Sequence, residues 1–212
     1  MNQTTLKWLR LFTPAALAWL LLLPVKEYVP FLGAEQPEFD ISYFKLPLWA
    51  VALGVIYYIF NIRHYSNYRF HEKVRVNLRA MLWQIGRGST PVPAEWTDKK
   101  VKGTFYHLVD NSNSLTSKSK LVYFNGYIWT LVADARAVAF LVAFLSVGML
   151  FADPNNDAAR ISLSINAAVV AVSLFFSHMV TKKHIELSND QLSYIEQHLK
   201  DKLDEALKRD SL

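Results

Sequence analysis

Long apolar blocks alternate with polar segments along this chain, and the blocks have the length of membrane-spanning helices. Four of them stand out, at residues 6–25, 46–62, 137–152 and 161–180. A bilayer core of about 30 Å needs roughly 20 helical residues, and the third block can be extended backwards to about Tyr127. A soluble domain of 212 residues could bury one such block, but four are difficult to cover. The pattern therefore predicts an all-α membrane protein with four transmembrane helices and cytoplasmic helical extensions.

The first apolar block also has features of a signal peptide, because a basic start precedes a leucine-rich centre. A signal peptide would need small residues before its cleavage site. The candidate site that ends at Ala34 has Leu32 at the −3 position, which is too large. We therefore expect this block to be a retained membrane anchor.

The distribution of Lys and Arg predicts the orientation of the helices, because basic residues gather on the cytoplasmic side of a membrane. Residues 1–10, 63–120 and 181–212 together carry 19 basic residues, whereas residues 26–45 and 153–160 carry 3. The segment 26–45 also has four acidic residues. We therefore expect a multi-pass membrane protein, with both termini in the cytoplasm and the acidic loop on the opposite side of the membrane.

These patterns divide the chain into four parts. Residues 1–62 hold the first two transmembrane helices, and residues 63–126 form a basic cytoplasmic segment. Residues 127–180 hold the third and fourth transmembrane helices, and residues 181–212 form a cytoplasmic C-terminal helix. Within the basic segment, the Gly- and Pro-containing stretch 86–100 predicts a linker.

Composition narrows the chemistry that this chain can perform. Apolar residues make up 52% and aromatic residues 14%, yet the mean hydropathy is only +0.12, so very apolar and very polar stretches coexist. The absence of cysteine excludes disulfide scaffolds, thiol nucleophiles and Cys-ligated metals. No hydrolase, P-loop or dinucleotide-binding motif is present, and His107 and Asp110, at i, i+3 spacing, lack further ligands. We expect no enzymatic activity, no cofactor and no metal site.

No helix breaker follows the second block until Gly86, so residues 63–85 are expected to continue that helix into the cytoplasm. Basic residues border an apolar stripe on this helix, at Arg69, Lys73, Arg75 and Arg79. A basic amphipathic helix beside a membrane contacts anionic headgroups or a partner. Interleaved aromatic residues would also suit nucleic acid, but the positive-inside rule already accounts for the charge. We therefore expect nucleic acid only indirectly, through a partner.

Two structures are open for residues 121–130. Asn125-Gly126 between two apolar runs is a hairpin signal. The alternative is a helix that begins after a cap at Ser112 or Ser114 and ends at Gly126. An isolated hairpin is marginally stable, so the helix is favoured.

The tail helix has an apolar stripe that must pack against another surface. Its central members are Leu192, Ile195, Leu199 and Leu203. The surface that covers it could be the central segment, a second copy of the chain or a partner. Together with the basic helix, this stripe is the predicted partner-binding surface.

Polar residues inside the apolar blocks form two further candidate sites. Asp134 and Arg136 precede the most apolar part of the third block and could cap the helix and reach the headgroups, or form an ion pair or gate. On the fourth block one helical face carries four polar residues, which are Ser162, Asn166, Ser173 and Ser177. Such a face either packs against another helix or lines a pore in an oligomer.

In size and layout the chain resembles the small four-span membrane subunits of bacterial anti-phage defence systems, the Kiwa membrane subunit among them. The resemblance covers the whole chain as architecture, with four spans, cytoplasmic ends and a basic segment after Ile62. It implies a homo-oligomeric membrane sensor or scaffold that docks a cytoplasmic, DNA-binding effector. The alternative function is an oligomeric pore that dissipates the membrane potential.

Overall fold

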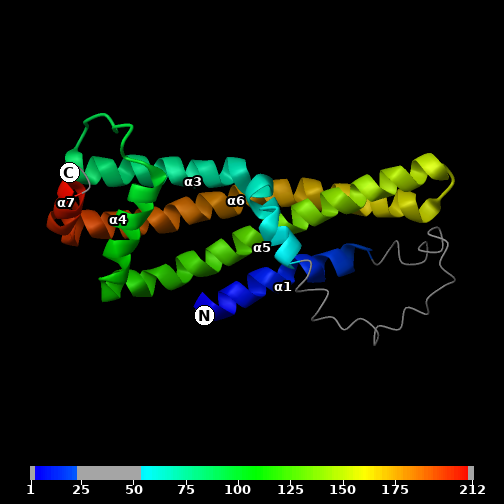
Figure 1. Ribbon diagram of the computed structural model, residues 1–212, viewed down its shortest axis with the longest axis horizontal. Helices are drawn as coiled ribbons and strands as arrows, with labels where there is room; N and C mark the ends of the chain where they lie inside the picture. The colour runs from blue at the N-terminus through cyan, green and yellow to red at the C-terminus, as the bar shows by residue number, and fades with distance from the viewer. Residues whose placement is uncertain (1–2, 23–53, 210–212) are drawn as a thin grey trace. The chain divides into compact units, whose positions relative to one another are not determined.

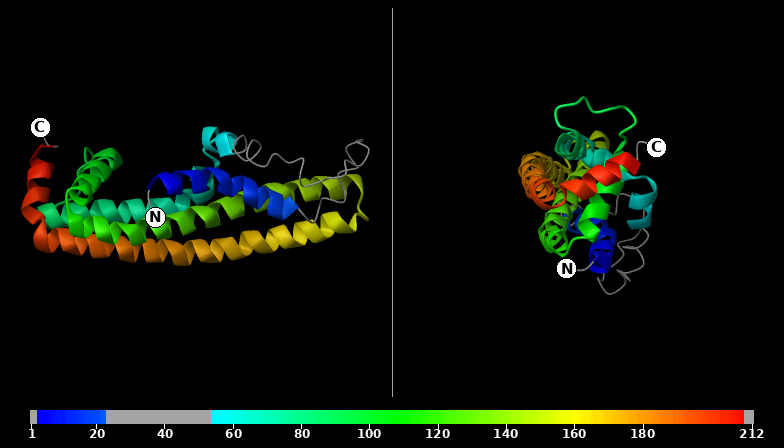
Figure 2. Two further views of the ribbon diagram at one scale, coloured as in Figure 1. Left: turned by 90° about the horizontal axis from the view of Figure 1, so that it is seen from below. Right: turned by 90° about the vertical axis from the view of Figure 1, so that its left-hand side faces the viewer.

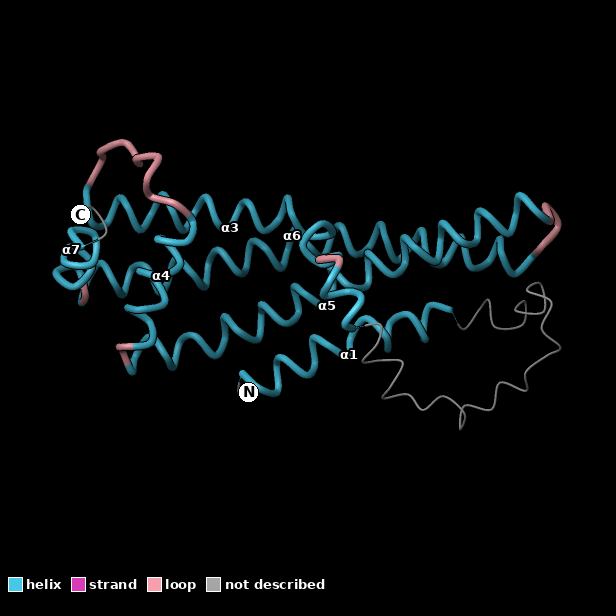
Figure 3. The backbone as a smooth tube through the Cα atoms, viewed as in Figure 1, coloured by secondary structure: helices cyan, strands magenta, loops and turns pink. Residues whose placement is uncertain are grey.

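The computed structural model describes residues 3–22 and 54–209, and every regular element among them is an α-helix (Figures 1 and 3). Residues 54–59 form a short helical stretch. The longer helices are α1 (Gln3–Leu22), α3 (Ile62–Arg87), α4 (Asp98–Asp110), α5 (Asn113–Ala152), α6 (Asp157–His198) and α7 (Lys200–Arg209). The all-α fold class predicted from the sequence is therefore confirmed.

Two of the helices are long and apolar enough to cross a membrane, judged by length and composition. They are α5 and α6, whose most apolar windows have mean hydropathies of 2.1 and 1.8. They contain the third and fourth apolar blocks. The first two blocks fall partly outside the described residues, and so does the predicted acidic loop at 26–45.

The described chain forms two compact units. Unit 1 contains residues 3–22, 54–67 and 127–177, and unit 2 contains residues 68–126 and 178–209. Helices α3, α5 and α6 therefore contribute to both units.

Unit 1 is built around small and branched side chains on α5. Ala139 is fully buried and Val138 and Val142 are nearly so, in a cluster with Leu21 of α1 and with Tyr57. The alanines let neighbouring backbones approach closely, as in other tightly packed helix pairs. Within this unit α5 and α6 lie side by side (Figure 2).

Unit 2 has a hydrophobic core of its own. Helix α4 contributes apolar residues at helical spacing, at Val101, Phe105 and Leu108, and all three are buried. The completely buried apolar side chains of the core are Leu82, Leu115, Leu192, Ile195 and Leu203. Trp96 belongs to this core and Trp83 packs against it, with the two ring centroids 5.8 Å apart.

Residues 121–130 are helical and lie inside α5, so the hairpin does not form. Gly126 does not end the helix either, contrary to our expectation. A glycine inside a helix costs only about 1 kcal/mol relative to alanine, and tertiary contacts outweigh that cost here. One such contact within unit 2 is the hydrogen bond that Asn125 Nδ2 donates to the carbonyl of Val180, at 3.1 Å.

The helix of the second block does not continue unbroken into residues 63–85, which corrects a second expectation. Phe60 and Asn61 form a turn before α3, and Asn61 has a φ of 50°. Asparagine tolerates this left-handed backbone better than most residues. At the other end α3 passes through Gly86 and stops at Arg87, where Gly88, with a φ of 66°, provides a C-terminal cap.

Candidate functional site

A buried ion pair lies at the centre of the most polar part of unit 1. Asp134, on α5, is completely buried, and Arg63, on α3, is 27% exposed. The guanidinium donates two hydrogen bonds to the carboxylate, from Nε to Oδ1 at 2.8 Å and from Nη2 to Oδ2 at 2.6 Å. This two-pronged geometry is the strongest that an arginine and a carboxylate can form.

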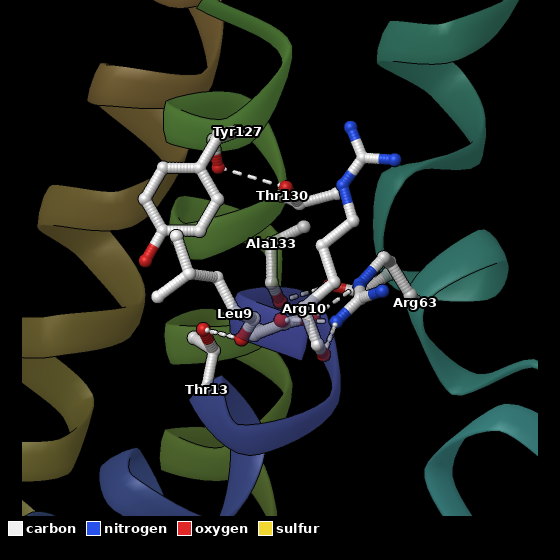
Figure 4. A network of polar contacts seen from close by, with 9 residues as sticks. Leu9, Arg10, Thr13, Arg63, Tyr127, Thr130 and Ala133 are labelled. Carbon is white, nitrogen blue, oxygen red and sulfur yellow. Dashed lines mark hydrogen bonds and ion pairs between the residues drawn. The ribbon is translucent and has the colours of Figure 1, made fainter. Parts of the chain in front are cut away.

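The same arginine also binds α1. Its Nη2 donates a hydrogen bond to the carbonyl of Arg10 at 2.8 Å, and its guanidinium lies 5.7 Å from the centre of the Tyr57 ring. Figure 4 shows Arg63 extending from α3 towards Arg10 of α1 and Ala133 of α5. Arg63 therefore ties three segments of unit 1 together around one carboxylate.

Arg136 lies two residues after Asp134 and binds other groups. It donates a hydrogen bond to Ser177 Oγ on α6 at 2.6 Å and a second one to the backbone carbonyl of Ser66 on α3. Ser66 in turn donates from Oγ to the carbonyl of Ala133 at 2.8 Å. The cluster thus contains Arg63, which binds the carboxylate of Asp134, and Arg136, which binds uncharged groups of α3 and α6. Its chemical capability is to hold and attract negative charge.

These contacts change the roles predicted for Asp134 and Arg136. Asp134 is no helix cap, because α5 begins 21 residues earlier, at Asn113. The carboxylate pairs with Arg63 rather than with Arg136. Sequence reasoning missed Arg63, whose 71-residue separation from Asp134 leaves no local signal.

The polar face of α6 is buried within unit 1. Ser162, Asn166, Ser173 and Ser177 are each at most 4% exposed. Ser146 Oγ of α5 donates to Ser162 Oγ at 2.9 Å, and Asn166 Nδ2 donates to the carbonyl of Ser162 at 2.8 Å. Of the two expectations for this face, helix packing is the one that its burial matches.

The four basic residues predicted on α3 differ in accessibility. Arg69 and Lys73 are exposed. Arg75 forms ion pairs with Glu72 and Asp98, and Arg79 donates to the carbonyl of Pro93 at 3.1 Å. Two of the four therefore serve internal contacts of unit 2.

The tail stripe is not a free surface, which corrects the expectation that it docks a partner. Leu192, Ile195 and Leu203 are completely buried in the core of unit 2, and Leu199 packs against that core. The central segment covers the stripe because α3, α4 and the start of α5 supply matching apolar faces. Partner binding would need another surface.

Unit 2 does have such a surface, in a groove of about 870 Å³ between α4 and α7. The residues that line it include Leu108 and Leu199, which are apolar, and three lysines, Lys99, Lys100 and Lys202. Glu205 is the one carboxylate among the lining residues. The groove therefore combines apolar surface with positive charge.

In the described part of the chain, no three His, Cys, Asp or Glu side chains lie close enough together to hold a metal ion. His107 and Asp110 are exposed and gain no further ligand there. Asn125 Nδ2 donates a hydrogen bond to His184 Nδ1 at 3.2 Å, and burial together with nearby His71 lowers the pKa of His184 to about 4.

Comparison of the chain with protein-family models, with curated proteins and with solved structures gives no match. The functional argument therefore depends on the contacts and charges described above.

Proposed function

We propose that this protein is a four-span membrane anchor that presents a folded helical unit to the cytoplasm, where the unit docks a cytoplasmic partner. In this proposal it resides in a bacterial inner membrane, with both termini inside the cell. The two candidate spanning helices support the membrane location. The arginine cluster of unit 1 lies in segments that the positive-inside rule assigns to the cytoplasmic boundary.

Exposed apolar side chains on unit 1 also support a lipid environment. An apolar surface of this extent is unfavourable in water, and in a bilayer it would contact acyl chains. The side chains concerned on α5 and α6 include Phe140, Leu141, Phe144, Leu145, Phe151, Ile161, Ile165, Val172, Leu174, Phe175 and Phe176.

The groove between α4 and α7 is the observation that carries the docking proposal. Its lysines, Lys99, Lys100 and Lys202, outnumber its one carboxylate, Glu205, and Leu108 and Leu199 add apolar surface. An acidic segment with apolar anchors, presented by a soluble protein, would complement both features. We therefore place the docking site here instead of on the tail stripe.

The resemblance to Kiwa-like membrane subunits extends this proposal to anti-phage defence. A homo-oligomer without enzymatic activity would hold the partner at the membrane until a signal changes the anchor. Nucleic acid would then be contacted by the partner. A pore remains the second function proposed from the sequence, but the burial of Ser162 and Asn166 within unit 1 favours the anchor.

The test is purification of the tagged protein from its native operon in mild detergent, with measurement of the mass of the complex. We expect a multimer with a second protein of one identity. Reversing charge in the groove with Lys99→Glu and Lys202→Glu should release that protein. Lys120→Glu with Lys182→Glu, at exposed positions of unit 2 outside the groove, is the matched control. Equal retention by both double variants would contradict the proposed docking site.

A further inference from the structure

A second cavity lies within unit 1, between α3, α5 and α6, with a volume of about 390 Å³. Tyr65 of α3 and Phe140 of α5 line it and are both exposed, so the cavity opens to the surface of the unit. Its lining is mostly apolar, with Ile62, Leu141 and Val170 among the contributing residues.

One end of this cavity is polar and cationic. Arg136 lines it, and the hydrogen bonds from Arg136 to Ser177 and to the carbonyl of Ser66 fix the position of its guanidinium. Arg136 is only 7% exposed. A guanidinium held in this way is a positive charge in a fixed position, which a phosphate group can approach from the cavity.

The other end of the cavity is lined by apolar residues. The register of α5 and α6 shows how far these residues lie from Arg136. The two helices are antiparallel, because Arg136 contacts Ser177 whereas Ser146 contacts Ser162. Leu141 lies five residues beyond Arg136, about 7.5 Å along the helix. Polarity therefore changes along one axis, from a cation at Arg136 to aliphatic surface at Leu141.

The charges around the cationic end favour an anion. Arg63 binds both oxygens of the Asp134 carboxylate, so that carboxylate is held by an arginine other than Arg136. The two partners of Arg136 described above, Ser177 Oγ and the carbonyl oxygen of Ser66, are uncharged groups. An anionic ligand would complement the charge of Arg136.

We propose that this cavity binds an anionic phospholipid, with the phosphate at Arg136 and one acyl chain against Ala137, Leu141 and Val170. The inference rests on the proposed membrane location. Tyr65, an exposed residue of the cavity lining, has the amphipathic side chain that is typical of the headgroup region. Basic pockets between transmembrane helices on the cytoplasmic side bind anionic headgroups by the same chemistry.

The test uses native mass spectrometry of the intact protein in mild detergent, titrated with phosphatidylglycerol or with phosphatidylcholine of the same acyl chains. We expect phosphatidylglycerol to bind at least about tenfold more tightly. Arg136→Gln should remove that preference, with a loss of about tenfold in affinity for phosphatidylglycerol. Arg160→Gln is the matched control, because Arg160 is an exposed arginine of α6 outside the cavity. Equal binding of the two lipids, or unchanged preference in Arg136→Gln, would overturn the proposal.

A second variant keeps the test decisive if Arg136→Gln is poorly folded. Ala137→Phe would fill the cavity beside Arg136 and should lower phosphatidylglycerol affinity by about tenfold while the protein stays monodisperse. Glycerol phosphate, the headgroup without chains, should bind far more weakly than the lipid. Equal affinity for glycerol phosphate would identify a site for free phosphate esters and overturn the lipid assignment.

Failure of the lipid site and failure of the membrane proposal give different results. If the protein is absent from the membrane fraction of cells, the proposed membrane location is wrong. If it is in that fraction but shows no dependence on Arg136, only the lipid site is wrong.

Discussion

Removing Arg63 should destabilise the protein more than removing the charge of Asp134. In Arg63→Met the fully buried carboxylate loses both of its hydrogen bonds from the guanidinium, at 2.8 and 2.6 Å. In Asp134→Asn the guanidinium keeps an amide acceptor, and because it is 27% exposed it can also reach polar surroundings. A buried carboxylate without its partner is therefore the costlier state.

The magnitude follows from the geometry. Breaking one side of a buried ion pair costs about 3–5 kcal/mol. The partial exposure of Arg63 and the proximity of Arg10 to Asp134 place Arg63→Met near the lower limit, at about 3 kcal/mol. The double variant should be less destabilised than the two single losses added together, with a coupling energy of about 2 kcal/mol.

The assay is unfolding in mild detergent, followed by tryptophan fluorescence, for the wild type and the three variants. Arg160→Met is the control, since its ion pair with Asp157 has a distance of 3.4 Å and both side chains are more than half exposed. That pair should contribute less than about 0.5 kcal/mol. If Arg63→Met is as stable as Arg160→Met, or if the coupling energy is near zero, the assignment of a buried pair at the centre of unit 1 is refuted.

Three further predictions follow from individual side chains. Leu192→Ala should destabilise the protein by about 2–5 kcal/mol in chemical denaturation, because Leu192 is completely buried; a small effect would mean that it is a surface residue. Gly54→Ala should lower the melting temperature, since an added Cβ would lie 2.4 Å from the carbonyl oxygen of Leu11, whereas Gly148→Ala, with open space around it, should be tolerated. His184, beyond the apolar stretch 161–180, should make stability fall as the pH drops from 6.5 towards 4, because its pKa is about 4 in the fold and 6.5 in the unfolded chain. The loss is up to about 1.4 kcal/mol per pH unit, and His184→Gln should flatten the profile.

The elements that the sequence predicted well are those with a strong periodic signal. The polar residues of α6 are separated by 4, 7 and 4 positions, which return to one face of a helix, and all four are buried. The apolar stripe at Leu192 and Leu203 is on one face for the same reason. Periodicity reveals that a face must be covered, but it does not reveal what covers it.

Single residues that usually interrupt helices predict the helix ends of this protein less well than periodicity predicts its buried faces. Gly126 suggested a helix end, but the helix continues, because packing in unit 2 outweighs a propensity cost of about 1 kcal/mol. Asn61, with a φ of 50°, ends a helical stretch, but asparagine is a weaker turn signal in a sequence than glycine or proline. Its tolerance of positive φ is the one local feature that indicates a break at this position.

Only part of the candidate site could be predicted from the sequence. Asp134 and Arg136 were noticeable because charges beside an apolar block are costly. Their partners, Arg63 and Ser177, come from α3 and α6, and only the tertiary structure selects them. The groove between α4 and α7 has no sequence signature either, because it depends on how α7 turns after His198.

Cysteine labelling in intact cells tests the central claim most directly, because the chain has no cysteine of its own. The four single variants would be Ser42→Cys, Ser117→Cys, Asn155→Cys and Ser193→Cys. In spheroplasts of a bacterial host, a membrane-impermeant maleimide should label Cys introduced at Ser42 and Asn155. The variants at Ser117 and Ser193 should react only after lysis. Labelling of all four positions in intact spheroplasts, or protection of Asn155→Cys until lysis, would contradict a four-span anchor that presents unit 2 to the cytoplasm.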